Sequence, residues 1–383
     1  LVYLTLLSGK KGLGGAPAMV SVKRDKITLK DQEAQSRIID FGKEPKIRVG
    51  IIKLDSFYFD WNAAENGSKE PKSSTSDVKK ILESFKKENV DGIVMDLRSN
   101  GGGSLFEAVS LSGLFIKDGP IVQARSKEGR ADVKRDEDST ILYSGPMLVM
   151  VNKLSASATE IFAGAIRDYG RGIIVGDSQT HGKGSVQTVV GLNEFLKYWG
   201  INSDAGSVKI TNAKFYRING ESTQQKGISP DILIPALTDS MDVGESKIRN
   251  SLEWDRIPSV KFEAWMDEEN LNRTITILRN RSRLRLENDS DFINLKKTIE
   301  QYKKFKDRKT VSLNIDKRFK SYAEDMEIMN EHEKILGISE ESPDDSPEGK
   351  IDPKNDIQLR ETLNIIFDYI RLSDRQNGER ILL

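Results

Sequence analysis

A serine and a lysine are the two side chains of this sequence whose settings most favour covalent chemistry. Ser157 stands in SASAT, where an apolar, strand-like stretch gives way to a helix-like one. A hydroxyl at a helix N-terminus lies beside exposed backbone N–H groups, so the amide of Ala158 could stabilise an oxyanion formed on a substrate. A serine at such a junction more often only caps the helix. Ser157 alone therefore leaves both roles open.

Lys183, in THGKGSVQ, is a candidate general base. With an ordinary pKa of about 10.4, a lysine is almost entirely protonated at pH 7, so it accepts a proton only where burial lowers that pKa. A solvated surface lysine is the alternative. His181 is the competing base, and a Ser/His/acid triad would have to use it, because the other histidine, His332, lies in the charged segment NEHEK.

A run of three glycines, Gly101 to Gly103, also lies between a strand-like and a helix-like stretch. Exposed backbone amides in such a turn can form a second anion-binding edge. Glycine runs at these turns more often only relieve backbone strain, and neither a Walker lysine nor a spaced GxGxxG accompanies this one. The glycines therefore do not predict a phosphate site.

These residues lie between patterns that predict alternating strands and helices. Residues Val78, Ile81, Leu82 and Phe85 fall at i, i+3, i+4 and i+7, which predicts a helix with one apolar face after the segment SSTS. The segments IRVGIIKL, GIVMDL, MLVMV and GIIVG predict strands. Strands that alternate with helices through glycine or serine turns are typical of an α/β fold.

Both ends of the chain have other patterns. Two β-rich stretches, Leu1–Leu7 and Ala18–Leu29, predict a hairpin, which is marginally stable by itself. Residues 250–335 are charge-rich and predict helices. Gly337–Asp356 lacks periodicity and predicts a flexible loop, and Leu359–Leu372 predicts a helix with an apolar face.

Length and composition exclude several classes of protein. The 383 residues predict two or three compact units. Lysine plus arginine balance aspartate plus glutamate, 59 against 59, so charge does not argue for nucleic acid or an anionic membrane as partner. The lack of cysteine excludes disulfides, thiolate metal sites and cysteine nucleophiles. No apolar run reaches the roughly 18 to 20 residues that cross a bilayer. A start without methionine predicts a piece of a longer protein, from which a signal peptide could have been removed.

Four segments, taken together, resemble the C-terminal processing peptidases, the family of the tail-specific proteases. They are DLRSNGGGSLFEAVSLSGLFI, KLSASATEIFAGAIRDYGRGIIVG, HGKGSVQ and KFYRINGESTQQKGISPDI, in the family's order and nearly its spacing. The resemblance implies an α/β fold with a crotonase-like or Clp-protease-like core. It implies the last strands of a truncated PDZ domain in residues 1–40, a serine peptidase core in 41–240 and a helical accessory region in 241–383.

The family's functional residues correspond to positions of this sequence. The resemblance implies that Ser157, the middle serine of the family's SASAS run, is the nucleophile and that Lys183, in the family's GKGxVQ motif, is its general base. It further implies that Gln187 orients the lysine. The oxyanion-binding amides would be those of Ala158 and Gly103.

Three further positions complete the comparison with the family. Asp168, in the helix after the serine, corresponds to an aspartate that supports the site. Thr159 replaces the third serine of the family's run. The segment GDSQTHGKG is one residue longer than the family's usual one and places His181 in the turn, so the local path of this loop is open.

The resemblance implies a periplasmic serine endopeptidase that needs no metal or cofactor. Its substrates would be proteins or peptides with accessible, apolar C-terminal tails, captured with the help of a PDZ domain or an adaptor protein, with no nucleic acid involved. One alternative is an inactive, peptide-binding scaffold of the same fold. Another is a crotonase-type acyl-CoA enzyme, whose catalytic carboxylates have no evident counterpart here.

Overall fold

A computed structural model describes most of the chain. The described residues are 1–7, 16–24, 33–42, 46–127, 129–201, 205–335 and 351–381. The chain forms two compact units, Leu1–Glu33 and Ala34–Leu383. The proposed domain boundaries near residues 40 and 240 stay predictions.

The first unit contains one strand pair. Strand β1 (Val2–Leu6) pairs antiparallel with β2 (Ala18–Val22), and Val2 lies opposite Val22. The predicted pairing of two β-rich stretches is therefore confirmed, although residues 8–15 and 25–32 lie outside the described part. That this pair is the remnant of a PDZ domain stays a prediction.

A six-stranded sheet forms the centre of the second unit. Its strands lie in the order β12 (Ile232–Leu233), β9 (Ile173–Gly176), β8 (Met147–Val151), β5 (Gly92–Asp96), β4 (Ile47–Lys53) and β3 (Gln35–Phe41). Every pair of neighbours is parallel except β3 and β4, which are antiparallel. The carboxyl ends of β5 and β8, which are neighbours, therefore lie at the same edge of the sheet.

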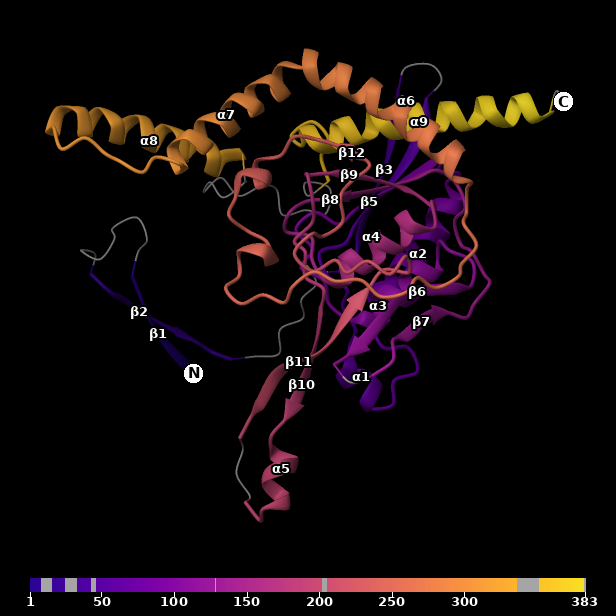
Figure 1. The fold of residues 1–383 in the computed structure, drawn as a ribbon, viewed down its shortest axis with the longest axis horizontal. Helices are drawn as coiled ribbons and strands as arrows, with labels where there is room; N and C mark the ends of the chain where they lie inside the picture. The colour runs from indigo at the N-terminus through magenta and orange to yellow at the C-terminus, as the bar shows by residue number, and fades with distance from the viewer. Residues whose placement is uncertain are drawn as a thin grey trace. The chain divides into compact units, whose positions relative to one another are not determined.

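Successive side chains of the central strands pack into two different cores. Ile93 and Met95 of β5 pack with helices α2 (Ser74–Lys87), α3 (Leu105–Gly113) and α4 (Ala158–Asp168). Val94 packs on the opposite face with α6 (Glu268–Asn288) and α9 (Ile357–Ile381), and Figure 1 shows these two groups of helices on the two sides of the sheet. Burial on both faces explains why β5 is apolar up to its last residue, Asp96.

A second sheet has four antiparallel strands, in the order β10 (Ser185–Gly191), β11 (Ser207–Tyr216), β6 (Gly119–Ser126) and β7 (Asp132–Asp136). Strand β6 contacts both α3 and α4. Two short helices, α1 (Trp61–Glu65) and α5 (Asn193–Tyr198), lie in connections. The 3₁₀ turns Leu237–Ser240 and Glu245–Lys247 follow β12.

The predicted helical region is confirmed from Glu268 onward. It contains α6, α7 (Ser290–Lys306) and α8 (Ile315–Ile335), and α9 begins at Ile357, two residues before the predicted start. Most of the predicted loop at 337–356 lies outside the described residues. The whole arrangement confirms an α/β fold with a C-terminal helical region. Among the described residues, no helix is long and apolar enough to cross a membrane.

Candidate active site

Two turns meet at the carboxyl edge of β5 and β8. The glycine turn follows β5, and the segment with Ser157 follows β8 and leads directly into α4. The N–H of Ala156 donates to the carbonyl oxygen of Asn100 at 2.9 Å, and the hydroxyl of Thr159 donates to the same oxygen at 3.0 Å. Because neighbouring parallel strands end at one edge, segments more than 50 residues apart in sequence lie side by side.

Ser157 has the backbone of a sharp turn. Its φ is +59°, a left-handed conformation that a residue other than glycine rarely adopts, and α4 begins at the next residue, Ala158. The N–H of Glu160 donates to the Ser157 carbonyl oxygen at 2.8 Å, so this donor is satisfied without the hydroxyl. The predicted position of Ser157 between strand and helix is confirmed.

Two of the three glycines of the turn, Gly102 and Gly103, are held so closely that no side chain would fit there. A methyl group at Gly102 would lie 2.8 Å from Cβ of Ser157 and 3.0 Å from the nitrogen of Ala158, and one at Gly103 would lie 2.3 Å from the carbonyl oxygen of Phe57. Both glycines have positive φ, +102° and +148°. The structure therefore brings the predicted Gly103 turn against the predicted Ser157–Ala158 segment.

Lys183 lies in the loop between β9 and β10. Its ammonium group donates to Oε1 of Gln187 at 3.2 Å, so the predicted lysine and glutamine are in contact. Burial lowers the pKa of Lys183, and the positive charge of Lys209 lowers it further, against the opposite effect of Glu245 and Glu160. The direction of this shift favours a lysine that accepts a proton.

Glu160, which the sequence interpretation did not select, ties the serine segment to the lysine loop. Its Oε2 accepts the N–H of Ser157 at 2.8 Å and the N–H of Lys183 at 2.9 Å. Its Oε1 accepts the N–H of Gly182 at 2.7 Å and the hydroxyl of Thr180 at 2.5 Å. Ser157 and Lys183 therefore share one oxygen atom as hydrogen-bond acceptor of their backbones.

Burial of Glu160 has an electrostatic consequence. Loss of hydration raises its pKa from 4.5 to about 7, although the four hydrogen bonds act in the opposite direction. The signal in the sequence was the spacing S-x-x-E, Ser157 to Glu160, which is typical of a capping box.

His181, the competing base, is hydrogen-bonded through its backbone and not through its ring nitrogen Nδ1. Its backbone N–H donates to the carbonyl oxygen of Ser155 at 2.9 Å. Its Nδ1 is buried without a hydrogen-bond partner among the described residues, and Oε2 of Glu245 is 4.0 Å away. That distance is too long for the hydrogen bond by which an acid orients a catalytic histidine. Burial also lowers the pKa of His181.

Asp168 is not brought to Ser157. It ends α4, whereas Ser157 precedes the first residue of that helix, and the eleven residues of α4 span about 16 Å along the axis. Its carboxylate pairs with Arg217 and accepts from Nε of that arginine at 3.1 Å. Asp168 thus holds α4 to the segment after β11, and a supporting role at the site stays a prediction.

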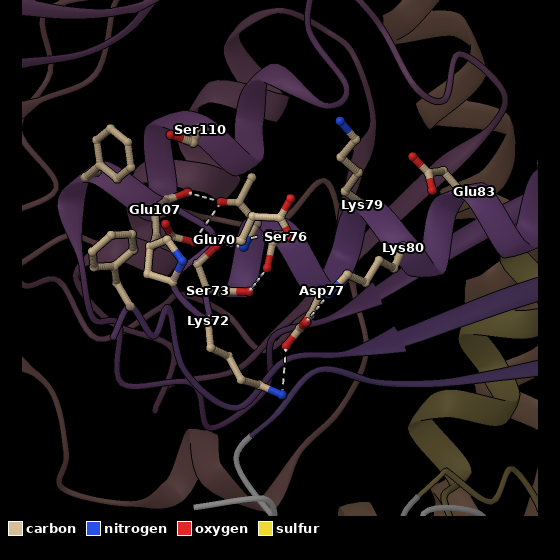
Figure 2. Close-up of a pocket in the computed structure, with 14 residues that line it drawn as sticks. Glu70, Lys72, Ser73, Ser76, Asp77, Lys79, Lys80, Glu83, Glu107 and Ser110 are labelled. Atoms are coloured by element: carbon tan, nitrogen blue, oxygen red, sulfur yellow. Dashed lines mark hydrogen bonds and ion pairs between the residues drawn. The ribbon is translucent and has the colours of Figure 1, made fainter. Parts of the chain in front are cut away.

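A surface cavity of about 670 Å³ between α2 and α3 is separate from this site. Its lining contains neither Ser157 nor Lys183. Figure 2 shows Asp77, one of its charged groups, paired with Lys72, and the two atoms are 3.4 Å apart. The cavity is therefore not part of the candidate active site.

Two family models match the chain. The model of peptidase family S41 matches residues 48–234, and that of the C-terminal domain of tail specific protease (DUF3340) matches residues 238–371. The chain belongs to peptidase family S41. The second match is more particular, since it places the helical region after β12 among the C-terminal domains of tail-specific proteases.

Two relatives in sequence agree with this assignment. The chain is 37% identical to the "Tail-specific protease" of Haemophilus influenzae over 97% of its own length and 52% of that protein's. It is 36% identical to the "Carboxy-terminal-processing protease" of Bartonella bacilliformis over 46% of this chain and 40% of that one. A solved "Photosystem II D1 C-terminal processing protease" is 26% identical, with a TM-score of 0.43, and the match covers 57% of this chain and 52% of that one. The chain thus spans about half the length of these relatives.

Proposed function

We propose that this chain is a serine endopeptidase that uses Ser157 as nucleophile and Lys183 as general base. The observation that carries the proposal is Glu160, because its carboxylate accepts the backbone N–H groups of both residues. A dyad needs its two members held in one fixed relation, and a single rigid acceptor supplies that relation. The contact of Lys183 with Gln187 gives the amine a defined direction.

In the proposed reaction the Ser157 oxygen attacks a peptide carbonyl carbon while its proton moves to the Lys183 amine. The backbone N–H groups of Ala158 and Gly103 stabilise the negative oxygen of the tetrahedral intermediate. The resulting ammonium group then returns the proton to the leaving amine as the C–N bond breaks. Water hydrolyses the acyl-enzyme with the same lysine as base, which restores the serine.

The substrates we propose are proteins with accessible, apolar C-terminal tails, which a PDZ domain or an adaptor protein captures and the Ser157 site then cleaves. The name of the Haemophilus relative and the match to the C-terminal domain of tail specific protease support this class. A periplasmic location and an adaptor protein that delivers substrates are further parts of the proposal. Both follow from the family resemblance alone.

The test is hydrolysis of a loosely folded protein by the unchanged chain and by Ser157→Ala. We expect the variant to lose activity by a factor on the order of 10⁴ or more, because the substitution removes the proposed nucleophile. Ser110→Ala, in α3, is the matched control and should retain full activity. Covalent labelling by a serine-directed reagent should disappear only in Ser157→Ala.

Two results would reject the proposal. Retention of more than a few per cent of activity in Ser157→Ala means that the nucleophile lies elsewhere. A folded, unchanged chain that neither hydrolyses nor becomes labelled is a peptide-binding scaffold.

A further inference from the structure

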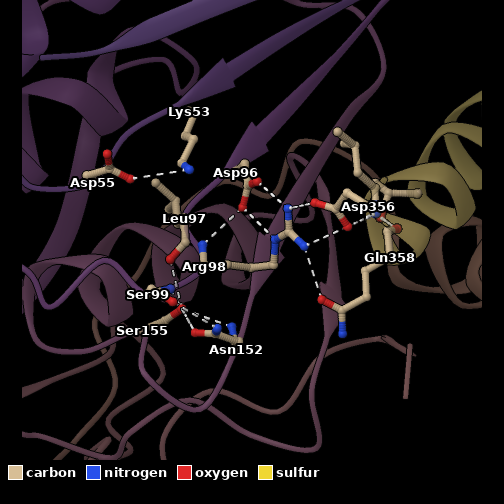
Figure 3. Close-up of polar contacts among 12 residues, drawn as sticks. Lys53, Asp55, Asp96, Leu97, Arg98, Ser99, Asn152, Ser155, Asp356 and Gln358 are labelled. Carbon is tan, nitrogen blue, oxygen red and sulfur yellow. Dashed lines mark hydrogen bonds and ion pairs between the residues drawn. The ribbon is translucent and has the colours of Figure 1, made fainter. Parts of the chain in front are cut away.

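Arg98 lies between the end of β5 and the glycine turn, and every N–H of its guanidinium group has an acceptor. Nε and Nη2 donate to Asp96 at 2.9 and 2.6 Å. Nη1 and Nη2 donate to the two oxygens of Asp356 at 3.1 and 2.5 Å, and Nη1 also donates to Oε1 of Gln358 at 3.0 Å. Figure 3 shows the arginine between the two carboxylates. Five donors in a rigid plane thus fix Arg98 from two sides.

Asp356 belongs to a different part of the chain. It lies immediately before α9, and its Oδ1 also accepts the N–H of Leu359 at 2.9 Å, so it caps that helix. Burial alone would raise the pKa of Asp356, but the charge and hydrogen bonds of Arg98 outweigh burial and lower it. The carboxylate is therefore ionised while it joins the first turn of α9 to the strand that leads into the glycine turn.

The residues around Arg98 connect it to both turns of the candidate site. The N–H of Ser99 donates to Oδ1 of Asn152 at 2.8 Å, and the hydroxyl of Ser155 donates to the carbonyl oxygen of Leu97 at 2.8 Å. Figure 3 shows these contacts directly beside the arginine. A shift of the Arg98 backbone would therefore be passed to the glycine turn and to the serine segment.

The backbone conformation of Ser99 makes the glycine turn depend on the contacts around it. Its φ is +59°, a conformation that costs free energy for a residue other than glycine and persists only when neighbouring contacts hold it. Those contacts are Arg98 on one side and Asn152 on the other. Loss of the Arg98 anchor should let the turn relax away from the arrangement that directs the Gly103 amide.

We propose that α9 positions the oxyanion-binding turn through the ion pair of Asp356 with Arg98, so that the C-terminal helical region sets the geometry of the peptidase site. Arg98 and Asp356 are positioning residues, since neither touches the reacting groups. The proposal rests on the proposed function for its kinetic readout. The movement of the turn can be measured without any activity.

Asp356→Asn is the informative variant because asparagine is also a good helix cap, so the substitution removes the charge and keeps the cap. The matched control is Glu361→Gln, the same chemical change on the same helix. Glu361 binds Arg285 of α6, with Nε 3.0 Å from each carboxylate oxygen, and not the glycine turn. Both variants lose one partner of a partly buried ion pair and should be destabilised to similar degrees.

Hydrogen exchange and kinetics are measured on both variants of the full chain. In Asp356→Asn we expect amides of residues 99–103 to exchange at least about tenfold faster, and kcat to fall about tenfold with KM changed less than about threefold. In Glu361→Gln both should stay within about twofold of the unchanged chain. If Asp356→Asn does not fold, Arg98→Lys replaces it, because lysine keeps the charge and loses the planar fork.

Equal behaviour of the two variants overturns the proposal, as does unchanged exchange at residues 99–103 in a folded Asp356→Asn. A fall in kcat/KM that arises only from KM also overturns it, because a misplaced oxyanion turn lowers kcat. Failure of the proposed function is recognised separately. In that case Ser157→Ala retains more than a few per cent of the activity, or the unchanged chain neither hydrolyses nor becomes labelled, while hydrogen exchange still decides whether Asp356 holds the turn.

Discussion

The state of charge of Lys183 is the decisive property at the scale of single residues. Only the neutral amine can take the serine proton, and below the pKa of a base its neutral fraction rises about tenfold per pH unit. Burial and the charge of Lys209 both lower the pKa of Lys183. The shift increases the neutral fraction at any given pH, but a lysine starts from a much higher value than a histidine.

We therefore expect the acylation rate to keep rising from pH 7 to at least about pH 8. Substitution of Lys209→Gln removes one cause of the lowered pKa of Lys183, so the midpoint of the profile should move to higher pH. Lys197→Gln, an exposed lysine of α5, is the control and should leave the midpoint unchanged. The measurement is the rate of labelling by a serine-directed reagent at a series of pH values.

A histidine base would give a different profile. With a pKa near 6.5 it would reach its plateau by about pH 7. A plateau there in a protein that circular dichroism shows to be folded, or turnover by Lys183→Arg, would contradict the role of Lys183, because guanidinium does not release its proton.

From the sequence alone, a site residue can be identified only by its type and by the local motif around it. The settings of Ser157 and Lys183 were visible because a serine before a helix and a lysine between glycines are local patterns. The role of Glu160 was not, since it depends on a loop more than 20 residues later in the chain. Its spacing from Ser157 is typical of a capping box, but that spacing carries no information on the donors of the later loop.

At the scale of elements, the candidate site depends on the hydrogen bonds that attach the β9–β10 loop to α4. Both oxygens of Glu160 accept two donors each, from Ser157 and Lys183 on one and from Thr180 and Gly182 on the other. An amide in this place has one acceptor atom, and its NH₂ group would face two donors. Buried donors that lose their acceptor cost about 1 to 3 kcal/mol each.

Glu160→Gln should therefore lower the free energy of unfolding by about 2 to 4 kcal/mol and reduce peptide hydrolysis strongly. The control is Glu107→Gln. Glu107 is similarly buried, but the three hydrogen bonds that its carboxylate accepts from Ser74 and Thr75 all end on Oε2, and an amide also has one acceptor oxygen. Denaturant unfolding of both variants is the measurement, and equal destabilisation would contradict the argument.

The raised pKa of Glu160 also predicts the direction in which the free energy of unfolding changes with pH. Its folded-state pKa of about 7 lies above the ordinary 4.5, so folding is accompanied by proton uptake. This contribution to stability is complete below about pH 4.5 and is lost as pH rises through about 7. The slope of stability against pH in this window should be smaller in Glu160→Gln than in the unchanged chain.

The elements themselves were largely predictable. The apolar face of α2 and the continuous apolar runs of β5 and β8 follow from burial, which imposes periods that a sequence displays. Helix α9 begins at Ile357, two residues before the predicted start, and Asp356 caps it by accepting the N–H of Leu359. The order of strands in the two sheets was not predicted, since it depends on contacts between distant segments.

At the scale of the whole chain, the central strands join the two family regions. Helices α6 and α9 cover one face of the six-stranded sheet, while the candidate site lies at its carboxyl edge. Arg98 and Asp356 are 258 residues apart in sequence, and no local pattern relates them. Contacts of this kind lie beyond sequence reasoning, because each partner by itself looks like an ordinary charged residue.

The unit Leu1–Glu33 bears on substrate recognition. All residues of β1 and β2 are exposed, and a strand pair by itself encloses no pocket for an apolar tail. A tail is read through buried contacts with its last side chains and its carboxylate. We therefore assign no tail recognition to these strands.

The last prediction follows from assigning no tail recognition to β1 and β2. Two substrates that are identical except for apolar or acidic final residues should be cleaved by this chain with kcat/KM values within about tenfold of each other, a difference of about 1.4 kcal/mol. A loosely folded carrier protein is suitable, since cleavage then depends on access to the Ser157 site alone. Substrates with an amidated C-terminus serve as the control, because they remove the tail carboxylate and leave the cleaved region unchanged. A preference well above tenfold that amidation abolishes would mean that the unit Ala34–Leu383 itself reads the tail.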